Sequence, residues 1–304
     1  MMDKTIFNNL RDILSNKFQN DLLDEAINNL NHDSRIRFSN FAYVIRELID
    51  IILSTKANDE DIKNCVWYVA PPETERQFNR FHKIKYMIQG GFEDGLFDTI
   101  LSINLDSEIF AINKYFRDEL SKHVHLNEKC FNYSKNEIEQ KIVTFLEIIN
   151  RFLKMIQDTK NRLNEFLVDE IEEFVNDALI SETISDLDLL STHTLVDSAE
   201  VEDICINEIT FNEIIGNITG TVHVDLQYGS DREVQNGFGD IWHDSYPFKL
   251  PFTINIDTAN DIFKDFINKK ILEEDFIPEF RNSLNDNLFL DTNNIYIDTS
   301  SFYD

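Results

Sequence analysis

Residues 138–179 read IEQKIVTFLEIINRFLKMIQDTKNRLNEFLVDEIEEFVNDAL. Apolar residues recur in this stretch every three to four positions, a spacing that places them on one face of an α-helix. They are Ile138, Ile142, Phe145, Leu146, Ile149, Phe152, Leu153, Ile156, Leu163, Phe166, Leu167, Ile171, Phe174 and Leu179. The stretch therefore predicts one very long amphipathic helix, or two stacked helices.

The same helical period runs through the chain before this stretch, at residues 6–14, 22–30 and 38–52. Three helix starts are marked by a capping residue followed three positions later by an acid or an amide. These pairs are Asn58 and Asp61, Thr74 and Gln77, and Ser134 and Glu137. Residues 1–190 are therefore predicted to form a helical bundle.

The period changes to two in the last third of the chain. Apolar and polar residues alternate over 221–228 and 248–256, which predicts half-buried antiparallel strands separated by a long loop at 229–239. Pro251 favours an edge position for the second strand, and a helix is expected from Ile262 to about Leu284. The predicted fold class is α+β, with a helical bundle at 1–190 and a smaller, acidic, antiparallel β-sandwich-like module with a C-terminal helix at 191–304.

Composition restricts the class of protein. The chain has 304 residues, 42% of them apolar, and 25 are phenylalanines, which is enough for two cores. No apolar run approaches the roughly 18 residues that cross a bilayer, and the first 14 residues do not resemble a signal peptide. Cys65, Cys130 and Cys205 lie far apart without a C-x-x-C pair, which is typical of thiols in a reducing compartment. We therefore expect a cytoplasmic protein without membrane contact.

Charge is distributed unevenly. Residues 1–180 contain 22 Lys and Arg against 31 Asp and Glu, a net charge of -9, whereas residues 181–304 contain 6 against 25, a net charge of -19. The acidic module favours a basic partner, or serves solubility alone. The segment 76–92 lacks any carboxylate and forms a basic island, with Arg76, Arg80, His82, Lys83 and Lys85.

One motif combines the residue types that metal-independent RNA cleavage needs. Residues 117–125 read RDELSKHVH, at the end of a helix predicted from about Asp106. A histidine can take the proton of a ribose 2′-hydroxyl, and an arginine can stabilise charge on the attacked phosphate. On a regular helix Arg117 and His123 point about 120° apart, so they converge only if the helix ends or loosens between them, or if a second subunit contributes.

The same cations also have a structural interpretation. Lys122, His123 and His125 fit the basic last turn of a helix, where positive charge complements the helix dipole. The motif by itself leaves the catalytic and the structural interpretations open.

The segment from Arg117 to His125 resembles the Arg-x(4–6)-His motif of HEPN ribonucleases. Those enzymes are helical, usually dimeric, and bring two such motifs together in one RNA-cutting cleft. The resemblance implies His123 and His125 as base candidates, Arg117 as the phosphate-stabilising residue, a homo-oligomer, and no metal or other cofactor. Asp118 and Glu119 depart from the usual pattern, because they bring two acids beside the expected phosphate site.

A broader resemblance covers about residues 34–258. SRIRFSNFAYVIREL at 34–48, LSKHVH at 120–125, and LQYGSD at 226–231 followed by Tyr246-Pro247-Phe248 resemble the predicted nucleases associated with prokaryotic Piwi-type proteins. The resemblance implies a role in prokaryotic antiviral defence, with RNA and other defence-system proteins as partners. The residues expected to position RNA are Arg76, Arg80, His82, Lys83, Lys85 and Lys122.

Two other functions compete with this hypothesis. His223, Asp225 and Gln227 resemble the acid-x-polar element of metal-dependent nucleases, but no lysine accompanies them and alternation alone places them on one solvent-facing side of a strand. We therefore predict no metal site. The second alternative is a non-catalytic sensor, adaptor or inhibitory subunit that binds a basic protein through the acidic module. Any chemistry is expected in the helical part.

Overall fold

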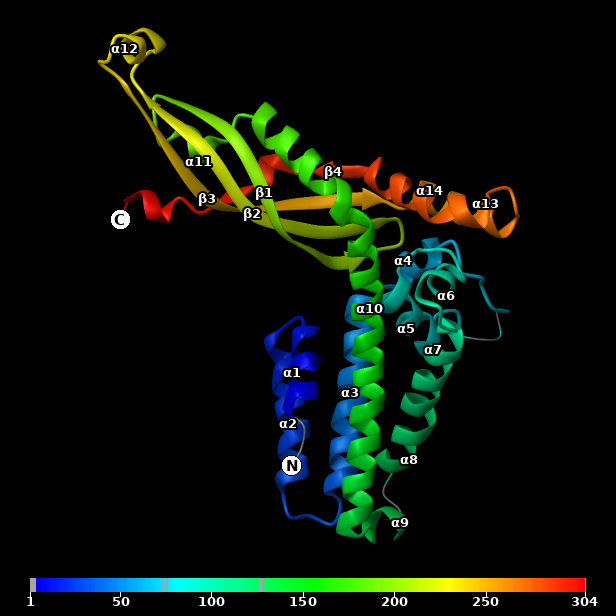
Figure 1. Ribbon diagram of the computed structural model, residues 1–304. Coiled ribbons are helices and arrows are strands. Elements are labelled where there is room, and N and C mark those ends of the chain that lie inside the picture. The colour runs from blue at the N-terminus through cyan, green and yellow to red at the C-terminus, as the bar shows by residue number, and fades with distance from the viewer. Residues whose placement is uncertain (1–3, 73, 75, 126–127, 304) are drawn as a thin grey trace. The chain divides into compact units, whose positions relative to one another are not determined.

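The computed structural model describes residues 4–72, 74, 76–125 and 128–303. Contacts divide the chain into two units, Met1–Thr159 and Lys160–Asp304. The division falls inside α10 (Lys135–Ser181). α10 is a single helix of 47 residues, so the apolar period of residues 138–179 belongs to one helix and not to two stacked ones (Figure 1). The predicted α+β class is confirmed, because a helical region is followed by an antiparallel sheet and further helices.

The first unit contains short and medium helices before α10. They are α1 (Lys4–Asp12), α2 (Lys17–Asn31), α3 (Arg37–Lys56), α4 (Asp59–Asn64), α5 (Arg80–Gln89), α6 (Leu96–Leu101), α7 (Leu105–Lys114), α8 (Leu120–Val124) and α9 (Glu128–Phe131). The core lies between α3 and the first half of α10, where the rings of Phe41 and Phe145 meet edge to face at 5.0 Å. The predicted start of α10 is confirmed, since Ser134 and Glu137 form reciprocal hydrogen bonds.

The helix that carries the basic island begins later than the sequence predicted. α5 starts at Arg80, and its capping residue is Asn79 rather than Thr74. The Asn79 side chain accepts a hydrogen bond from the backbone of His82, and the His82 ring accepts one from the backbone of Asn79. A histidine thus replaces the usual acid or amide of a capping box, and for this reason the start was not recognised.

A wider turn interrupts the helix that carries the Arg–His motif. Tyr115–Glu119 form a π-helical turn, η1, between α7 and α8. Such turns are rare and add a residue to the helical turn, which changes the direction of every side chain after it. Arg117 lies within this turn, and His123 lies beyond it on α8.

The second unit contains one antiparallel sheet rather than the two packed sheets of a sandwich. β1 (His193–Ile209), β2 (Glu213–Tyr228) and β3 (Asp240–Asn255) are long neighbouring strands, and β4 (Leu288–Leu290) and β5 (Tyr296–Ile297) both pair with β3 (Figure 1). The predicted loop at 229–239 contains a short helix, α12 (Asp231–Gln235), and α11 (Ser185–Asp188) precedes β1. Instead of one C-terminal helix, α13 (Asp257–Ile267) and α14 (Glu273–Asn285) follow β3, and two 3-10 turns (Thr292–Asn294 and Ser300–Tyr303) complete the described chain.

Pro251 does not lie on an edge strand, contrary to the prediction. β3 has β2 on one side and the two short strands on the other. β5 pairs at residues 248–249 and β4 at residues 252–254, so Pro251 falls between the two pairings. The carbonyl of Pro251 accepts a hydrogen bond from the backbone N–H of Asp291. The N–H that proline lacks is therefore not needed for the pairing of β3 with β4 or β5.

Side chains of α10 satisfy the backbone of the outer strand β1. Asn164 donates to the carbonyl of Ile204, Lys160 donates to that of Asn207, and Asn176 accepts from the backbone of Ala199. These contacts cover an edge that would otherwise expose unpaired backbone groups. None of the described helices combines the length and apolar composition that crossing a bilayer requires.

Candidate functional site

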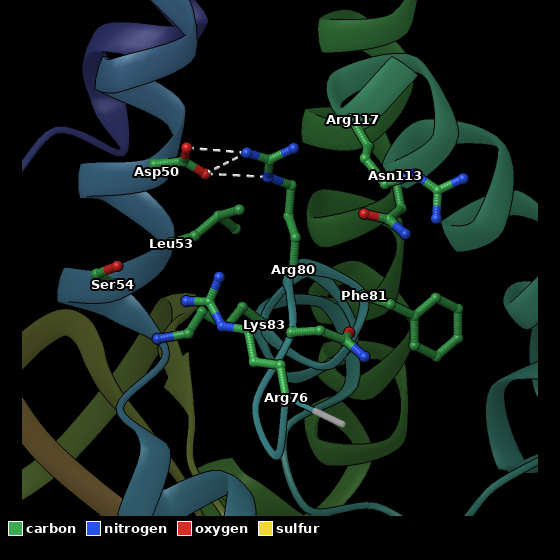
Figure 2. A pocket seen from close by; sticks show the side chains of 10 residues that line it. Asp50, Leu53, Ser54, Arg76, Arg80, Phe81, Lys83, Asn113 and Arg117 are labelled. Carbon is green, nitrogen blue, oxygen red and sulfur yellow. Dashed lines mark hydrogen bonds and ion pairs between the residues drawn. The ribbon is translucent and has the colours of Figure 1, made fainter. Parts of the chain in front are cut away.

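A cavity of about 470 Å³ in the first unit gathers several of the predicted cations (Figure 2). α3 supplies one wall, the start of α5 a second, and the end of α7 with η1 a third. The lining residues are Asp50, Leu53, Ser54, Arg76, Asn79, Arg80, Phe81, Lys83, Asn113 and Arg117. We call this cavity the cationic pocket, because among the described residues four basic side chains line it with a single carboxylate.

Arg80 is held in the cationic pocket by Asp50 of α3. Arg80 Nη2 lies 2.6 Å from Asp50 Oδ1 and 2.8 Å from Oδ2, and Arg80 Nε lies 2.9 Å from Oδ1. Lys83, one turn further along α5, donates to Asp59 Oδ1 at 2.8 Å and to the carbonyl of Ala57 at 3.2 Å. Both cations are therefore fixed in place by residues that precede the basic island in the sequence.

Arg117 enters the same pocket from the π-helical turn. Its partner is the neighbouring Asp118, with Arg117 Nε 2.7 Å from Asp118 Oδ1 and Nη2 3.0 Å from Oδ2. This hydrogen bond and the paired charge raise the pKa of Arg117 and lower the pKa of Asp118. The Arg117 side chain is 62% exposed, so a ligand in the pocket can reach it. Arg76 is also exposed and forms no ion pair with any residue that the structure describes.

Two members of the basic island are not in the cationic pocket. Lys85 is 5% exposed and lies 2.6 Å from Asp94 Oδ1 and 3.0 Å from Asp106 Oδ1, beneath the ring of Trp67. His82 caps α5, and its burial lowers its pKa. These side chains stabilise the helical unit and do not present a cationic surface to a ligand.

His123 lines a different cavity, of about 490 Å³, which we call the histidine pocket. His123 Nδ1 lies 3.1 Å from Tyr133 Oη, and His123 Nε2 lies 3.5 Å from Lys141 Nζ. The full lining is Phe38, Tyr115, Glu119, His123, Tyr133, Glu137, Gln140, Lys141 and Thr144. His125 follows α8 and is exposed, and Lys122 is exposed and pairs with Glu119 at 2.7 Å; neither residue lines either pocket.

The geometry of α3 separates the two pockets. Phe38 lines the histidine pocket, whereas Asp50, twelve residues later on the same helix, lines the cationic pocket. At 1.5 Å per residue the two positions lie about 18 Å apart along the helix axis. Arg117 and His123 therefore do not share a cavity within this chain.

The polar side of the sheet holds the residues considered for a metal. His223 Nδ1 lies 2.7 Å from Ser245 Oγ, and Asp225 Oδ1 lies 2.5 Å from His243 Nδ1. Gln227 is 9% exposed and turns away to Gly229 and Asp231. Across the described residues, no group of three or more His, Cys, Asp or Glu side chains is arranged to hold a metal ion.

Sequence reasoning missed the residues that complete each pocket. Asp50, Asn79 and Asn113 in the cationic pocket carry no motif, and Asp50 reaches Arg80 across 30 positions. In the histidine pocket, Tyr133 and Lys141 flank the start of α10. The Ser134–Glu137 pair predicts that helix start, and therefore that Tyr133 and Lys141 lie near a helix terminus. It does not predict that they lie beside His123.

The comparisons with known proteins gave two family matches. Models described as a predicted pPIWI-associating nuclease match residues 11–149 and residues 156–270. The first range covers both pockets, and the second covers the three long strands. No curated protein and no solved structure matches the chain.

Proposed function

Because the chain belongs to the predicted pPIWI-associating nucleases, we propose that it is a metal-independent endoribonuclease of prokaryotic antiviral defence that binds the RNA backbone in its cationic pocket. The observation that carries this proposal is that Arg76, Arg80, Lys83 and Arg117, from separate segments of the chain, line one cavity. Arginine and lysine side chains bind phosphate through charge-assisted hydrogen bonds. A nucleic-acid backbone is the ligand that offers such phosphates in series.

Charge balance within the chain supports the same location. Residues 1–159 contain 20 Lys and Arg against 25 Asp and Glu, whereas residues 160–304 contain 8 against 31. The first unit is therefore close to neutral, with a net charge of -5, and the second has a net charge of -23. A polyanion is repelled by the second unit and is attracted to the local excess of positive charge in the first.

The four cations have different roles in this proposal. Arg80 and Lys83 are pre-positioned by Asp50 and Asp59, so they lose little side-chain freedom when a phosphate arrives. Arg76 and Arg117 are exposed, and Figure 2 shows their labelled side chains on different sides of the pocket. Asn79 and Asn113 add neutral groups that can hydrogen-bond to ribose or phosphate oxygens.

A binding assay tests the cationic pocket directly. We expect Arg117→Ala and Arg76→Ala each to weaken binding of a fluorescent single-stranded RNA and to reduce the slope of log affinity against log salt by about 0.7. Lys63→Ala is the matched control, because Lys63 is an exposed cation on α4 that does not line the pocket. Unchanged binding in both arginine variants would remove the pocket from the proposal.

A cleavage assay tests the reaction class. We expect the purified protein to cut an RNA pool with EDTA present, and Arg117→Ala to reduce the rate at sub-saturating RNA. Cutting that EDTA abolishes would argue for a metal-dependent nuclease instead. A DNA pool of the same length tests substrate class, because DNA lacks the 2′-hydroxyl that metal-independent cleavage uses as nucleophile.

The alternative, a non-catalytic adaptor, has one specific observation in its favour. β1 exposes a series of carboxylates at Asp197, Glu200, Glu202, Asp203 and Glu208. A basic protein segment is the complementary ligand. Calorimetry with a basic peptide, compared at 50 and 300 mM salt, would favour this function if the peptide binds and RNA does not.

A further inference from the structure

The histidine pocket contains two residues, Tyr133 and Lys141, to which neither the sequence motif nor the cationic pocket assigns a role. Both touch His123, one at each ring nitrogen. The ring of Phe38 packs against the imidazole edge to face, with centroids 5.1 Å apart and planes at 71°. His123 is 8% exposed. Its contacts with Tyr133, Lys141 and Phe38 hold the ring in one orientation.

The hydrogen-bonding properties of the neighbours determine which nitrogen of the neutral ring carries the proton. A lysine ammonium has donors and no acceptor. His123 Nε2, 3.5 Å from Lys141 Nζ, is therefore the acceptor nitrogen. It follows that Nδ1 carries the proton and donates to Tyr133 Oη at 3.1 Å. The lone pair of Nε2 faces the pocket beside a cation.

Lys141 differs from the lysines that stabilise this unit. Lys83, Lys85 and Lys122 each form an ion pair with a carboxylate. Among the described residues, Lys141 forms no ion pair, and its contacts are the imidazole of His123 and the ring of Tyr133, whose centroid lies 4.9 Å from Nζ.

Each of the two acids that line the histidine pocket forms a hydrogen bond with a residue other than Lys141. Glu119 pairs with Lys122, and Glu137 caps α10 through Ser134. Lys141 has no ion-pair partner among the described residues, although the hydrogen bond from Lys122 and, to a smaller extent, the charge of Lys141 lower the pKa of Glu119 in the same pocket. Lys141 can therefore accept an anionic oxygen as its counter-ion.

We propose that the histidine pocket is the cleavage centre, in which Lys141 binds the scissile phosphate, His123 acts as the base, and Tyr133 is the positioning residue that fixes the His123 tautomer. This inference rests on the proposed function, RNA cleavage, and adds to it the site of the reaction. When Lys141 moves from Nε2 to a phosphate oxygen, the His123 lone pair becomes available for a ribose 2′-hydroxyl.

The step balances without a cofactor. His123 Nε2 takes the 2′-hydroxyl proton, the 2′-oxygen forms a bond to phosphorus, and the bond from phosphorus to the 5′-oxygen breaks. The leaving 5′-oxygen takes a proton from the Lys141 ammonium. The imidazolium then returns its proton to the neighbouring lysine amine, and both groups regain their starting states. The products are a 2′,3′-cyclic phosphate and a 5′-hydroxyl.

The separation of the two pockets predicts a length requirement. At about 3.4 Å per stacked nucleotide, the 18 Å along α3 corresponds to roughly five nucleotides. An RNA bound in the cationic pocket and cut in the histidine pocket must span that distance. We expect an octanucleotide to be cut with a kcat/KM at least ten-fold above that of a dinucleotide, and an equal kcat/KM would overturn the coupling of the two pockets.

One variant and a matched control test the centre. Lys141→Met is expected to lower kcat about 100-fold or more, with RNA affinity changed much less, because the cationic pocket is intact. Lys135→Met is the control, since Lys135 lies on the same helix but is 77% exposed and outside the pocket. Equal rates for Lys141→Met and Lys135→Met in an enzyme that cuts RNA would overturn the centre while the proposed function stands.

The positioning role has a readout that does not depend on activity. Nitrogen NMR of His123 in the protein without RNA is expected to show the Nδ1–H tautomer, and Tyr133→Phe is expected to give a mixture of tautomers together with a lower kcat and an unchanged melting temperature. A single, unchanged tautomer in Tyr133→Phe would overturn this assignment. A wild-type protein that cuts no RNA but shows the fixed tautomer would count against the proposed function and not against the geometry.

A mixing experiment separates this arrangement from a shared site of two copies. We expect Arg117→Ala and His123→Ala, when mixed, to cut no faster than either alone, because both pockets belong to one chain. If the mixture regains activity, Arg117 of one copy acts with His123 of another, and the single-chain coupling is overturned.

Discussion

Arg80 and Asp50 form a bidentate ion pair, in which two nitrogens of the guanidinium lie 2.6 and 2.9 Å from the same carboxylate oxygen. Asp50 is also the single carboxylate among the described residues that line the cationic pocket. It therefore orients Arg80 and at the same time cancels one positive charge. The balance between these two effects can be measured.

Asp50→Asn is expected to strengthen RNA binding about five-fold at low salt, because removing a negative charge that repels the phosphate is worth roughly 1 kcal/mol. The amide can still accept a hydrogen bond from Arg80, so its orientation is partly retained. Anisotropy titrations from 50 to 300 mM salt measure the effect. Asp33→Asn, an exposed acid outside the pocket, is the control. Weaker binding in Asp50→Asn would mean that orientation outweighs charge.

Lys83 and Lys85 are expected to separate binding from stability. Lys83→Met should weaken RNA binding several-fold and lower the free energy of unfolding less than Lys85→Met does, because Lys83 is more exposed and pairs with one carboxylate instead of two. Lys85→Met should leave binding intact but destabilise the fold by about 2 kcal/mol, below the 3–5 kcal/mol of a fully buried pair, since Asp94 and Asp106 remain half exposed. Urea unfolding and RNA titration of both variants test this. Loss of binding in a stable Lys85→Met would contradict the structural role.

His82 is expected to make the first unit less stable in mild acid. Burial is the largest cause that lowers its pKa, and the charge of Lys85 acts in the same direction. As pH falls below about 6.5, His82 becomes protonated in the unfolded chain but stays neutral in the folded chain. The free energy of unfolding therefore falls as the pH falls. This contribution is complete above pH 6.5 and is lost below it.

His82→Gln isolates that contribution, because glutamine retains the acceptor of the capping box but does not titrate. Between pH 7 and pH 5, the wild type is expected to lose more stability than the variant, as measured by urea unfolding. Parallel curves for the two proteins would show that His82 does not titrate in this range.

The sequence predicted the longer helices of the first unit, such as α2 and α3, because each buries a single apolar face. The limits of β2 were harder to predict. Its apolar alternation was recognised only from residue 221, although the strand begins at Glu213. Gly216 and Gly220 occupy the buried side of the strand before that point, so the alternation is broken where the rings of Phe252 and Phe248 on β3 fill the space.

The site was predictable in part. The sequence grouped Arg76, Arg80 and Lys83 in one basic island, and the structure places these three residues in one cavity with Arg117. Lys83 and Lys85 are two residues apart, so the helical period places them on different faces of α5. The period does not indicate which of the two faces is buried. The π-helical turn at Tyr115–Glu119 and the distant partners, such as Asp50 and Lys141, depend on tertiary packing that no local pattern records.

Gly220→Ala is expected to destabilise the second unit by about 3 kcal/mol, at the upper end of overpacking costs. A Cβ at this position would lie 2.0 Å from the carbonyl oxygen of Glu200 on β1 and 2.9 Å from the ring of Phe248 on β3. The ring can turn aside, but the carbonyl belongs to a strand that α10 holds in place. β1 must therefore shift away from β2.

Gly237→Ala is the comparison for Gly220→Ala, because a Cβ there meets nothing within 4 Å but the backbone has φ +74°. Left-handed strain alone should cost about 1 kcal/mol. Urea unfolding monitored by the circular dichroism of the sheet measures both. If Gly220→Ala loses no more stability than Gly237→Ala, β1 and β2 can separate without loss, and the close approach of Glu200 to Gly220 does not restrain the sheet.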